Sequence, residues 1–213
     1  MPTKNISKAD PKPFSEVIYS TNDFLIAQCY KNSTINNEST PNIIQGQVVK
    51  IKSSYDTSYA TFGIITKINN SSIDNIHRPS ALGLNASELE QFQPQIYDLL
   101  RKELEIYLFA YTNDGNKVTS ELPPKPMVVH DFVYQANDGE LFQLTENFLN
   151  LANIIKKHGL KLNLLADLVS LGYKLRNNNY EYLVEKAQNL SITFSDEVDS
   201  LMLLLRKIKP VNV

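Results

Sequence analysis

Hydrophobic residues in the first two thirds of the chain come in short runs rich in Val, Ile, Tyr and Phe. Stretches rich in Asn, Ser and Pro separate these runs. Runs of this length and composition predict the strands of a small antiparallel β structure. The expected strands are EVIYS and FLIAQCY within 16–30, GQVVKIK at 46–52, ATFGIITKI at 60–68, LEIYLFAYT at 104–112, and two more within KVTSELPPKPMVVHDFVYQA at 117–136, the last of them around 129–135.

Two glycines stand at informative places in this β region. Gly46 opens one run, and Gly63 interrupts the next. A glycine inside a strand usually marks a bulge or a sharp bend, such as the corner of a barrel. The region therefore predicts strongly bent strands.

A segment with helical spacing interrupts the β region, and we expect it to be an inserted helical segment over 84–103. Ser87, followed three residues later by Glu90, fits a capping box, which predicts a helix start near residue 88. Pro94 either kinks this helix or begins a second one. The apolar residues keep a spacing that predicts a docked apolar face. They are Leu89, Phe92, Ile96, Leu99 and Leu100.

The pattern changes after residue 139. Residues 140–208 contain no proline and show apolar residues at helical spacing. Four helices with short connections are expected, so neighbours should be antiparallel. Their approximate spans are 140–157, 162–175, 179–190 and 196–208. Strands followed by helices predict an α+β protein, or a β domain followed by a helical one.

Charge and cysteine content restrict the function only weakly. The 213-residue chain has a formal net charge of −2, which does not demand nucleic acid or an anionic membrane as partner. Cys29 is the single cysteine, so an internal disulfide and a Cys-based zinc site are excluded, and its apolar surroundings predict a buried, inert thiol. The chain start lacks an apolar signal segment, and no stretch is long enough to cross a bilayer. We therefore expect a cytoplasmic protein without membrane insertion.

The sequence shows no motif for catalysis. The three histidines, His77, His130 and His158, lie in unrelated segments without ligand spacing. Walker A, dinucleotide-binding, nucleophile-elbow and zinc-protease motifs are all missing from the sequence. These observations predict a protein that is not an enzyme and that uses no cofactor or metal.

One alternative function is nucleic-acid binding through a basic face of the β structure. Lys50 and Lys52 share one face of their strand, because side chains two residues apart point the same way. The alternative requires the fold to bring them together with Lys67 and Arg78.

Two further segments, HRPSALG at 77–83 and LPPKPMVVHDFVY at 122–134, resemble features of stand-alone HAS-barrel proteins of the cyanobacterial or plastid type. The strands around QVVKI and FGIITKI are similar to the same family, which is named after HerA-type DNA-translocating ATPases and the ATP synthase. The residues that carry the resemblance as structural motifs are Gly46, Gly63, Arg78, Pro79, Gly83, Pro123 and Pro124.

This resemblance implies a six-stranded barrel over 16–136, in which Gly63 lets a strand bend and RPSALG holds the crossover to the inserted helix. A leader over 1–15 would precede the barrel, and an all-α domain over 140–210 would follow it. In the ATPase families a P-loop domain follows the barrel, whereas here helices without its signature follow. The implied role is therefore assembly rather than nucleotide hydrolysis. We expect a non-catalytic adaptor that binds partner proteins or itself, through a barrel edge or the helical face.

Overall fold

The computed structural model describes residues 12–30, 42–73, 80–114 and 117–209. Six antiparallel strands form a closed barrel in the order β1-β2-β5-β4-β3-β6, with β6 pairing back to β1. The predicted α+β fold with a six-stranded antiparallel barrel is thus confirmed. The strands are β1 (Ser15–Ser20), β2 (Phe24–Cys29), β3 (Val48–Lys52), β4 (Ala60–Ser72), β5 (Leu100–Thr112) and β6 (Phe132–Gln135). The prediction of a further strand ahead of the proline corner was wrong, since the described residues there form only an isolated bridge between Tyr111 and Thr119.

Alternation along the strands produces two separate apolar surfaces. The inward side chains, such as Ile51, Ile65 and Ile106, fill the barrel interior. The outward side chains Phe62 and Ile64 are also buried, because helices cover this side of the barrel. The outer face of the barrel and the helices therefore share one apolar core, and the barrel interior forms a second. Phe14, which falls in the expected leader, is already buried in the barrel, whereas residues 1–11 lie outside the described part of the chain.

Gly63 lies where the register between β4 and β5 shifts. Phe62 pairs with Ala110 and Gly63 pairs with Leu108, so Phe109 is the extra residue. A Cβ on Gly63 would collide with the side chain of Ile106 and would lie 2.8 Å from the carbonyl oxygen of Tyr107. The bulge also attaches the helical layer, because the side chain of Asn150 donates a 2.7 Å hydrogen bond to the carbonyl of Phe109.

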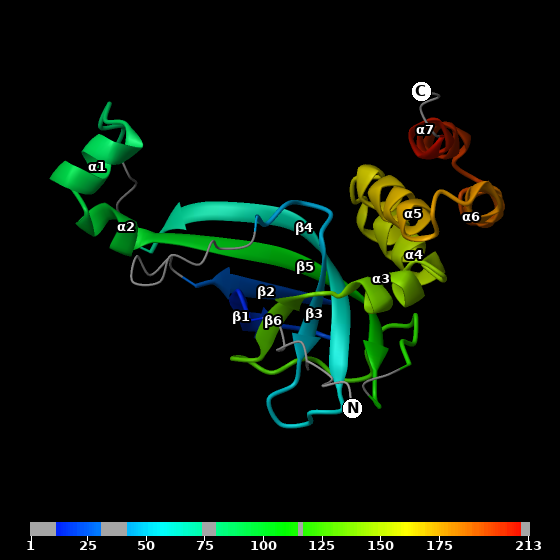
Figure 1. Ribbon diagram of the computed structural model, residues 1–213, viewed down its shortest axis with the longest axis horizontal. Helices are drawn as coiled ribbons and strands as arrows, with labels where there is room; N and C mark the ends of the chain where they lie inside the picture. Colours follow the sequence, from blue (N-terminus) through cyan, green and yellow to red (C-terminus); the bar gives the residue numbers. More distant parts are fainter. Residues whose placement is uncertain (1–11, 31–41, 74–79, 115–116, 210–213) are drawn as a thin grey trace, which may run out of the picture.

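Five helices pack beside the barrel and form the right-hand side of Figure 1. Three of them agree with the predicted spans to within a few residues, but the span 140–157 is divided into two helices at residues 145–148, so the prediction of one helix there was wrong. The helices are α3 (Asp138–Leu144), α4 (Leu149–His158), α5 (Asn163–Leu175), α6 (Tyr180–Thr193) and α7 (Val198–Ile208).

The break between α3 and α4 is held by side chains from distant helices. The hydroxyl of Tyr182 donates to the carbonyl of Thr145 at 2.8 Å, and Lys186 donates to the carbonyl of Glu146 at 2.7 Å. Arg176 donates to the carbonyl of Phe142 at 2.9 Å. These donors satisfy carbonyls that a continuous helix would have used internally.

β4 and β5 continue beyond the barrel as a two-stranded arm that carries two short helices, at the left of Figure 1. The helices are α1 (Ala86–Phe92) and α2 (Gln95–Leu99), so Pro94 separates two helices, and β5 begins at Leu100, inside the span predicted as helical. The capping box is formed by Asn85 and Glu88, and the prediction of Ser87 with Glu90 was wrong.

Candidate protein-binding surfaces

The barrel interior offers no reaction chamber, because apolar side chains fill it. Burial raises the pKa of the Cys29 thiol to about 11, against a smaller opposing effect of the charge on Lys102. The thiol is therefore protonated at neutral pH and shielded, as predicted from its surroundings. Among the described residues, only the hydroxyls of Ser15 and Thr61 are buried side-chain polar groups without a hydrogen-bond partner.

The described histidines are not brought together. His130 pairs with Glu16 on the barrel surface. His158 lies against the ring of Tyr107, with centroids 5.0 Å apart. His77 lies outside the described residues. Within the described part of the chain, no group of three or more His, Cys, Asp or Glu side chains is arranged to hold a metal ion.

The residues that carried the family resemblance lie in turns and close contacts. Gly46 and Gly83 adopt positive φ angles of 87° and 69°, a backbone conformation that glycine tolerates without strain. The carbonyls of Pro123 and Pro124 accept hydrogen bonds of 3.4 and 3.3 Å from the side chain of Asn22, so this corner is tied to the turn of the β1–β2 hairpin. Arg78 and Pro79 lie outside the described residues.

The predicted basic face is divided by ion pairs and distance. Lys50 is paired with Glu140 of α3, so it connects the barrel to the helices. Lys67 is 2.9 Å from the carboxylate of Glu105. Lys52 lies over the ring of Tyr134, 4.9 Å from its centroid.

Lys67 is also distant along the sheet from the other two lysines. Lys50 pairs with Phe62, and Lys67 lies five residues further along β4, or about 16 Å at the usual rise of a strand. Arg78, the fourth member of the face, is outside the described residues. The three described lysines therefore do not form one basic patch.

The closed barrel leaves its strands paired, and the first exposed apolar surface lies instead at the end of the arm. No described side chain between residues 67 and 103 is buried. The apolar face predicted to dock does not dock, since Phe92 is 63% exposed and Leu99 is 50% exposed. We call the exposed apolar side chains here the arm tip. They are Ile73, Leu82, Leu84, Phe92, Leu99 and Leu100.

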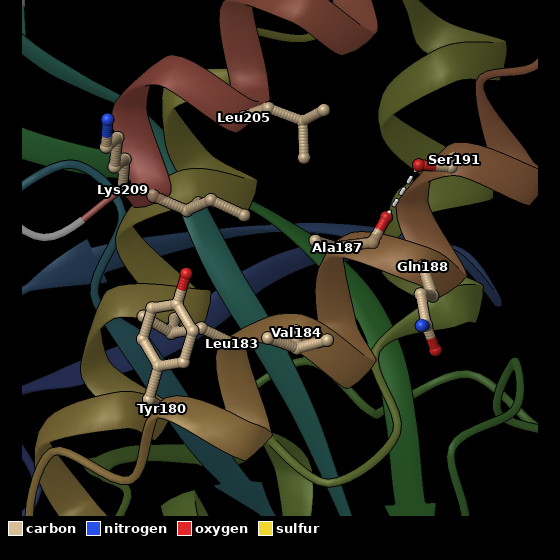
Figure 2. Close-up of a pocket in the computed structure, with 9 residues that line it drawn as sticks. Tyr180, Leu183, Val184, Ala187, Gln188, Ser191, Leu205 and Lys209 are labelled. Atoms are coloured by element: carbon tan, nitrogen blue, oxygen red, sulfur yellow. Dashed lines mark hydrogen bonds between the residues drawn. The ribbon is translucent and has the colours of Figure 1, made fainter.

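The second exposed apolar surface is a groove between α6 and α7, which we call the α6–α7 groove (Figure 2). It has a volume of about 340 Å³. Its apolar lining consists of Tyr180, Leu183, Val184, Ala187, Leu205 and Ile208, and its polar rim of Gln188, Ser191 and Lys209.

The lining of the groove follows from helical spacing. Tyr180, Val184 and Ala187 lie on one side of α6, and Ser191 keeps its own donor occupied by bonding to the carbonyl of Ala187 at 2.8 Å (Figure 2). On α7, Leu205 and Ile208 line the groove and lie three residues apart, so they share one side of the helix.

The orientation of α6 depends on the buried cluster that holds the α3–α4 break. Arg176 lies between the rings of Phe142 and Tyr182, 4.0 and 4.5 Å from their centroids. A Cβ on Gly172 would collide with the hydroxyl of Tyr182 and would lie 2.8 Å from Cβ of Thr145, so this position needs a glycine. The groove is therefore built on a rigidly packed helix.

A larger hollow of about 520 Å³ lies where the barrel meets α5. Its walls combine Gln45 and Gly46 of the barrel with Asp167, Ser170 and Lys174 of α5. No buried polar atom without a partner points into it from the described residues, since both such atoms are in the barrel interior. The hollow therefore shows no sign of a ligand site.

No protein-family model matches the chain, and none of the curated proteins compared with it matches either. A closed six-stranded barrel is the architecture that the HAS-barrel resemblance implies, but an architecture alone does not identify a family. The family assignment remains a prediction carried by the quoted residues. Among the described residues, no helix has the length and apolar character to span a bilayer.

Proposed function

We propose that this protein is a non-catalytic adaptor that binds other proteins through the arm tip and the α6–α7 groove. The observation that carries the proposal is the gathering of large exposed apolar side chains at two ends of a molecule whose barrel interior is filled. Contiguous exposed apolar surface framed by polar residues is typical of protein-binding sites.

The arm supports this function because it has no evident role within the chain itself. An isolated two-stranded ribbon is marginally stable in water, and this one buries none of its described apolar side chains. Burying a large apolar side chain contributes about 1.5–3 kcal/mol. Burial of two or three such side chains against a partner would therefore offset a large part of the entropy lost on association. The barrel would act as the spacer between the two binding surfaces.

The test is an affinity purification from extract of the native cell, comparing the wild type with Phe92→Asp and Val184→Asp. Both positions are exposed, so the substitutions should leave the fold intact, which circular dichroism would verify. Tyr55→Asp is the matched control, because Tyr55 is an aromatic residue that is 83% exposed but belongs to neither surface. We expect a partner protein that the wild type and the control retain and that at least one other variant loses. Identical sets of proteins from all four baits would contradict the proposal.

Nucleic-acid binding is the alternative function, and the ion pairs of Lys50 and Lys67 do not favour it. A titration with single-stranded DNA and RNA at increasing salt would decide between the two functions. Binding that weakens steeply with salt would support the alternative, since it reports the release of counterions from phosphates. An adaptor that uses apolar surfaces should show no such binding.

A further inference from the structure

The two apolar surfaces carry opposite net charge. Residues 80–103, which run from the approach to the two helices of the arm into the first residues of β5, contain four acidic and two basic residues, a net charge of −2. At one end of the groove, the C-terminal end of α7 exposes three cations, Arg206, Lys207 and Lys209, of which Lys209 lines the groove, and the first half of α6 exposes two acidic residues, Glu181 and Glu185. A tip with net negative charge thus has a groove end with net positive charge as its complement on the same chain.

The two surfaces are also complementary in form. The arm tip is a projection on which Phe92 and Leu99 are exposed, whereas Val184 and Leu205 line a concave groove. A projecting apolar surface buries most of its area when it enters an apolar groove.

A molecule cannot fill its own groove with its own arm. Figure 1 places α1 and α2 at one end of the longest axis of the molecule and α6 and α7 at the other, with the barrel between them. Contact between tip and groove therefore requires two molecules.

We propose that the α6–α7 groove binds the arm tip of a second copy of this chain, which gives a head-to-tail contact between copies. This inference rests on the proposed function, because it names the partner of the same two surfaces. The contact joins two different surfaces, so each bound copy still presents a free tip and a free groove. Repetition of the contact produces a closed ring or an open filament, depending on the rotation between copies.

The first measurement is analytical ultracentrifugation of the wild-type protein over a range of concentrations. We expect species larger than a dimer to accumulate as the concentration rises. Raising the salt concentration from about 0.1 M to about 1 M shortens the Debye length from about 10 Å to about 3 Å, so the assembly should weaken over this range.

The decisive measurement mixes two variants that each lack one half of the contact. Phe92→Asp removes the tip and Val184→Asp removes the groove, so each alone should be monomeric, with a dissociation constant raised at least about tenfold. Mixed in equal amounts, they retain one intact groove and one intact tip, and the assembly should stop at a heterodimer. Ile192→Asp is the control for the groove, because Ile192 is exposed on α6 but does not line it. Tyr55→Asp is the control for the tip, and both controls should assemble as the wild type does.

Two results would overturn the inference. One is a wild type that stays monomeric at every concentration, and the other is an assembly that Phe92→Asp and Val184→Asp leave unchanged. Affinity purification then separates this failure from that of the adaptor function. If the same variants still lose a partner from the extract, the adaptor function stands with another protein in the groove. If they lose none, both proposals fall.

Discussion

The hairpin of β4 and β5 passes through two environments, the barrel and the arm. Within the barrel, β4 also pairs with β3 and β5 also pairs with β2, and their side chains are buried on both faces where the helices cover them. Beyond the barrel the same two strands pair only with each other in the described part of the chain, and none of their described side chains is buried.

The difference shows that the neighbouring elements, and not the amino-acid composition of β4 and β5, decide which of their side chains are buried. Closure of the barrel supplies partners for both edges of each strand, and the helices supply a second apolar layer. The arm receives neither, so its described apolar residues are not buried. Stability should therefore reside in the barrel and binding in the arm.

Removing apolar side chains from the two regions should give the largest contrast. Ile106 is fully buried in the barrel, and Ile106→Ala should lower the free energy of unfolding by about 4 kcal/mol. Phe92→Ala, in the arm, should change it by less than about 0.5 kcal/mol although it removes a larger side chain. Urea denaturation monitored by circular dichroism would measure both. A loss of several kcal/mol in Phe92→Ala would show that the arm belongs to the cooperative core.

Two glycines allow the same contrast to be drawn with one added methyl group. Gly63→Ala places a Cβ against the backbone of β5 and should destabilise the fold by about 3 kcal/mol. A Cβ on Gly83 meets no atom within 4 Å. The only cost of Gly83→Ala is therefore that of placing alanine at a positive φ angle, which destabilises the fold by about 1 kcal/mol. Thermal unfolding of the two variants at equal concentration would rank them. Equal losses would mean that the arm packs as tightly as the barrel.

The buried thiol predicts a pH dependence that comes from the barrel. The pKa of Cys29 is raised to about 11 in the folded protein, whereas in the unfolded chain the thiol ionises near pH 9. Its contribution to stability is therefore complete below about pH 9 and is lost as the pH rises toward about 11. Cys29→Ala should lose less of its stability over this window than the wild type loses. Denaturation curves for both proteins at several pH values would reveal the difference, and parallel losses would contradict it.

The smallest effect should come from the unpaired hydroxyl of Thr61. Its hydroxyl is buried in the barrel without a hydrogen-bond partner among the described residues, so Thr61→Val should stabilise the protein by up to about 1 kcal/mol. Ser71→Val, a polar-to-apolar change at a half-buried position in the arm whose hydroxyl accepts a hydrogen bond from Arg101, is the comparison and should not stabilise. Urea denaturation would measure both changes. Destabilisation by Thr61→Val would indicate that the hydroxyl has an unseen partner.

The elements of the fold were readily predicted because they depend on local patterns. Most of the β-rich runs and three of the C-terminal helices appear in the structure close to their predicted places, and of the two alternatives left open at Pro94 the structure has the second helix. The break at residues 145–148 was missed, since the groups that take over its carbonyls come from Tyr182 and Lys186, about forty residues away. The spacing of apolar residues within 140–157 contains no information about those distant donors.

The candidate surfaces were less predictable than the fold. The helical spacing of Leu89, Phe92 and Leu99 predicts an apolar face that packs against the protein. The same spacing is equally compatible with an apolar face that stays exposed, as Phe92 and Leu99 do. The groove residues Val184 and Leu205 lie within two of the predicted helices, 179–190 and 196–208, but nothing in the spacing of the apolar residues indicates a hollow between these helices. Lys50 was predicted to belong to a basic face. Its ion pair with Glu140 could not be predicted, because the two residues are 90 positions apart and meet only where α3 packs beside β3.

The order of side chains along the chain determined which segments are strands and which are helices, because backbone preferences and the alternation of apolar residues act over a few neighbours. The tertiary structure alone decided which apolar faces were covered, how the strands closed on one another and where the arm and the groove remained open. Coverage depends on contacts between residues far apart in the chain, and those contacts exist only when the segments are packed together.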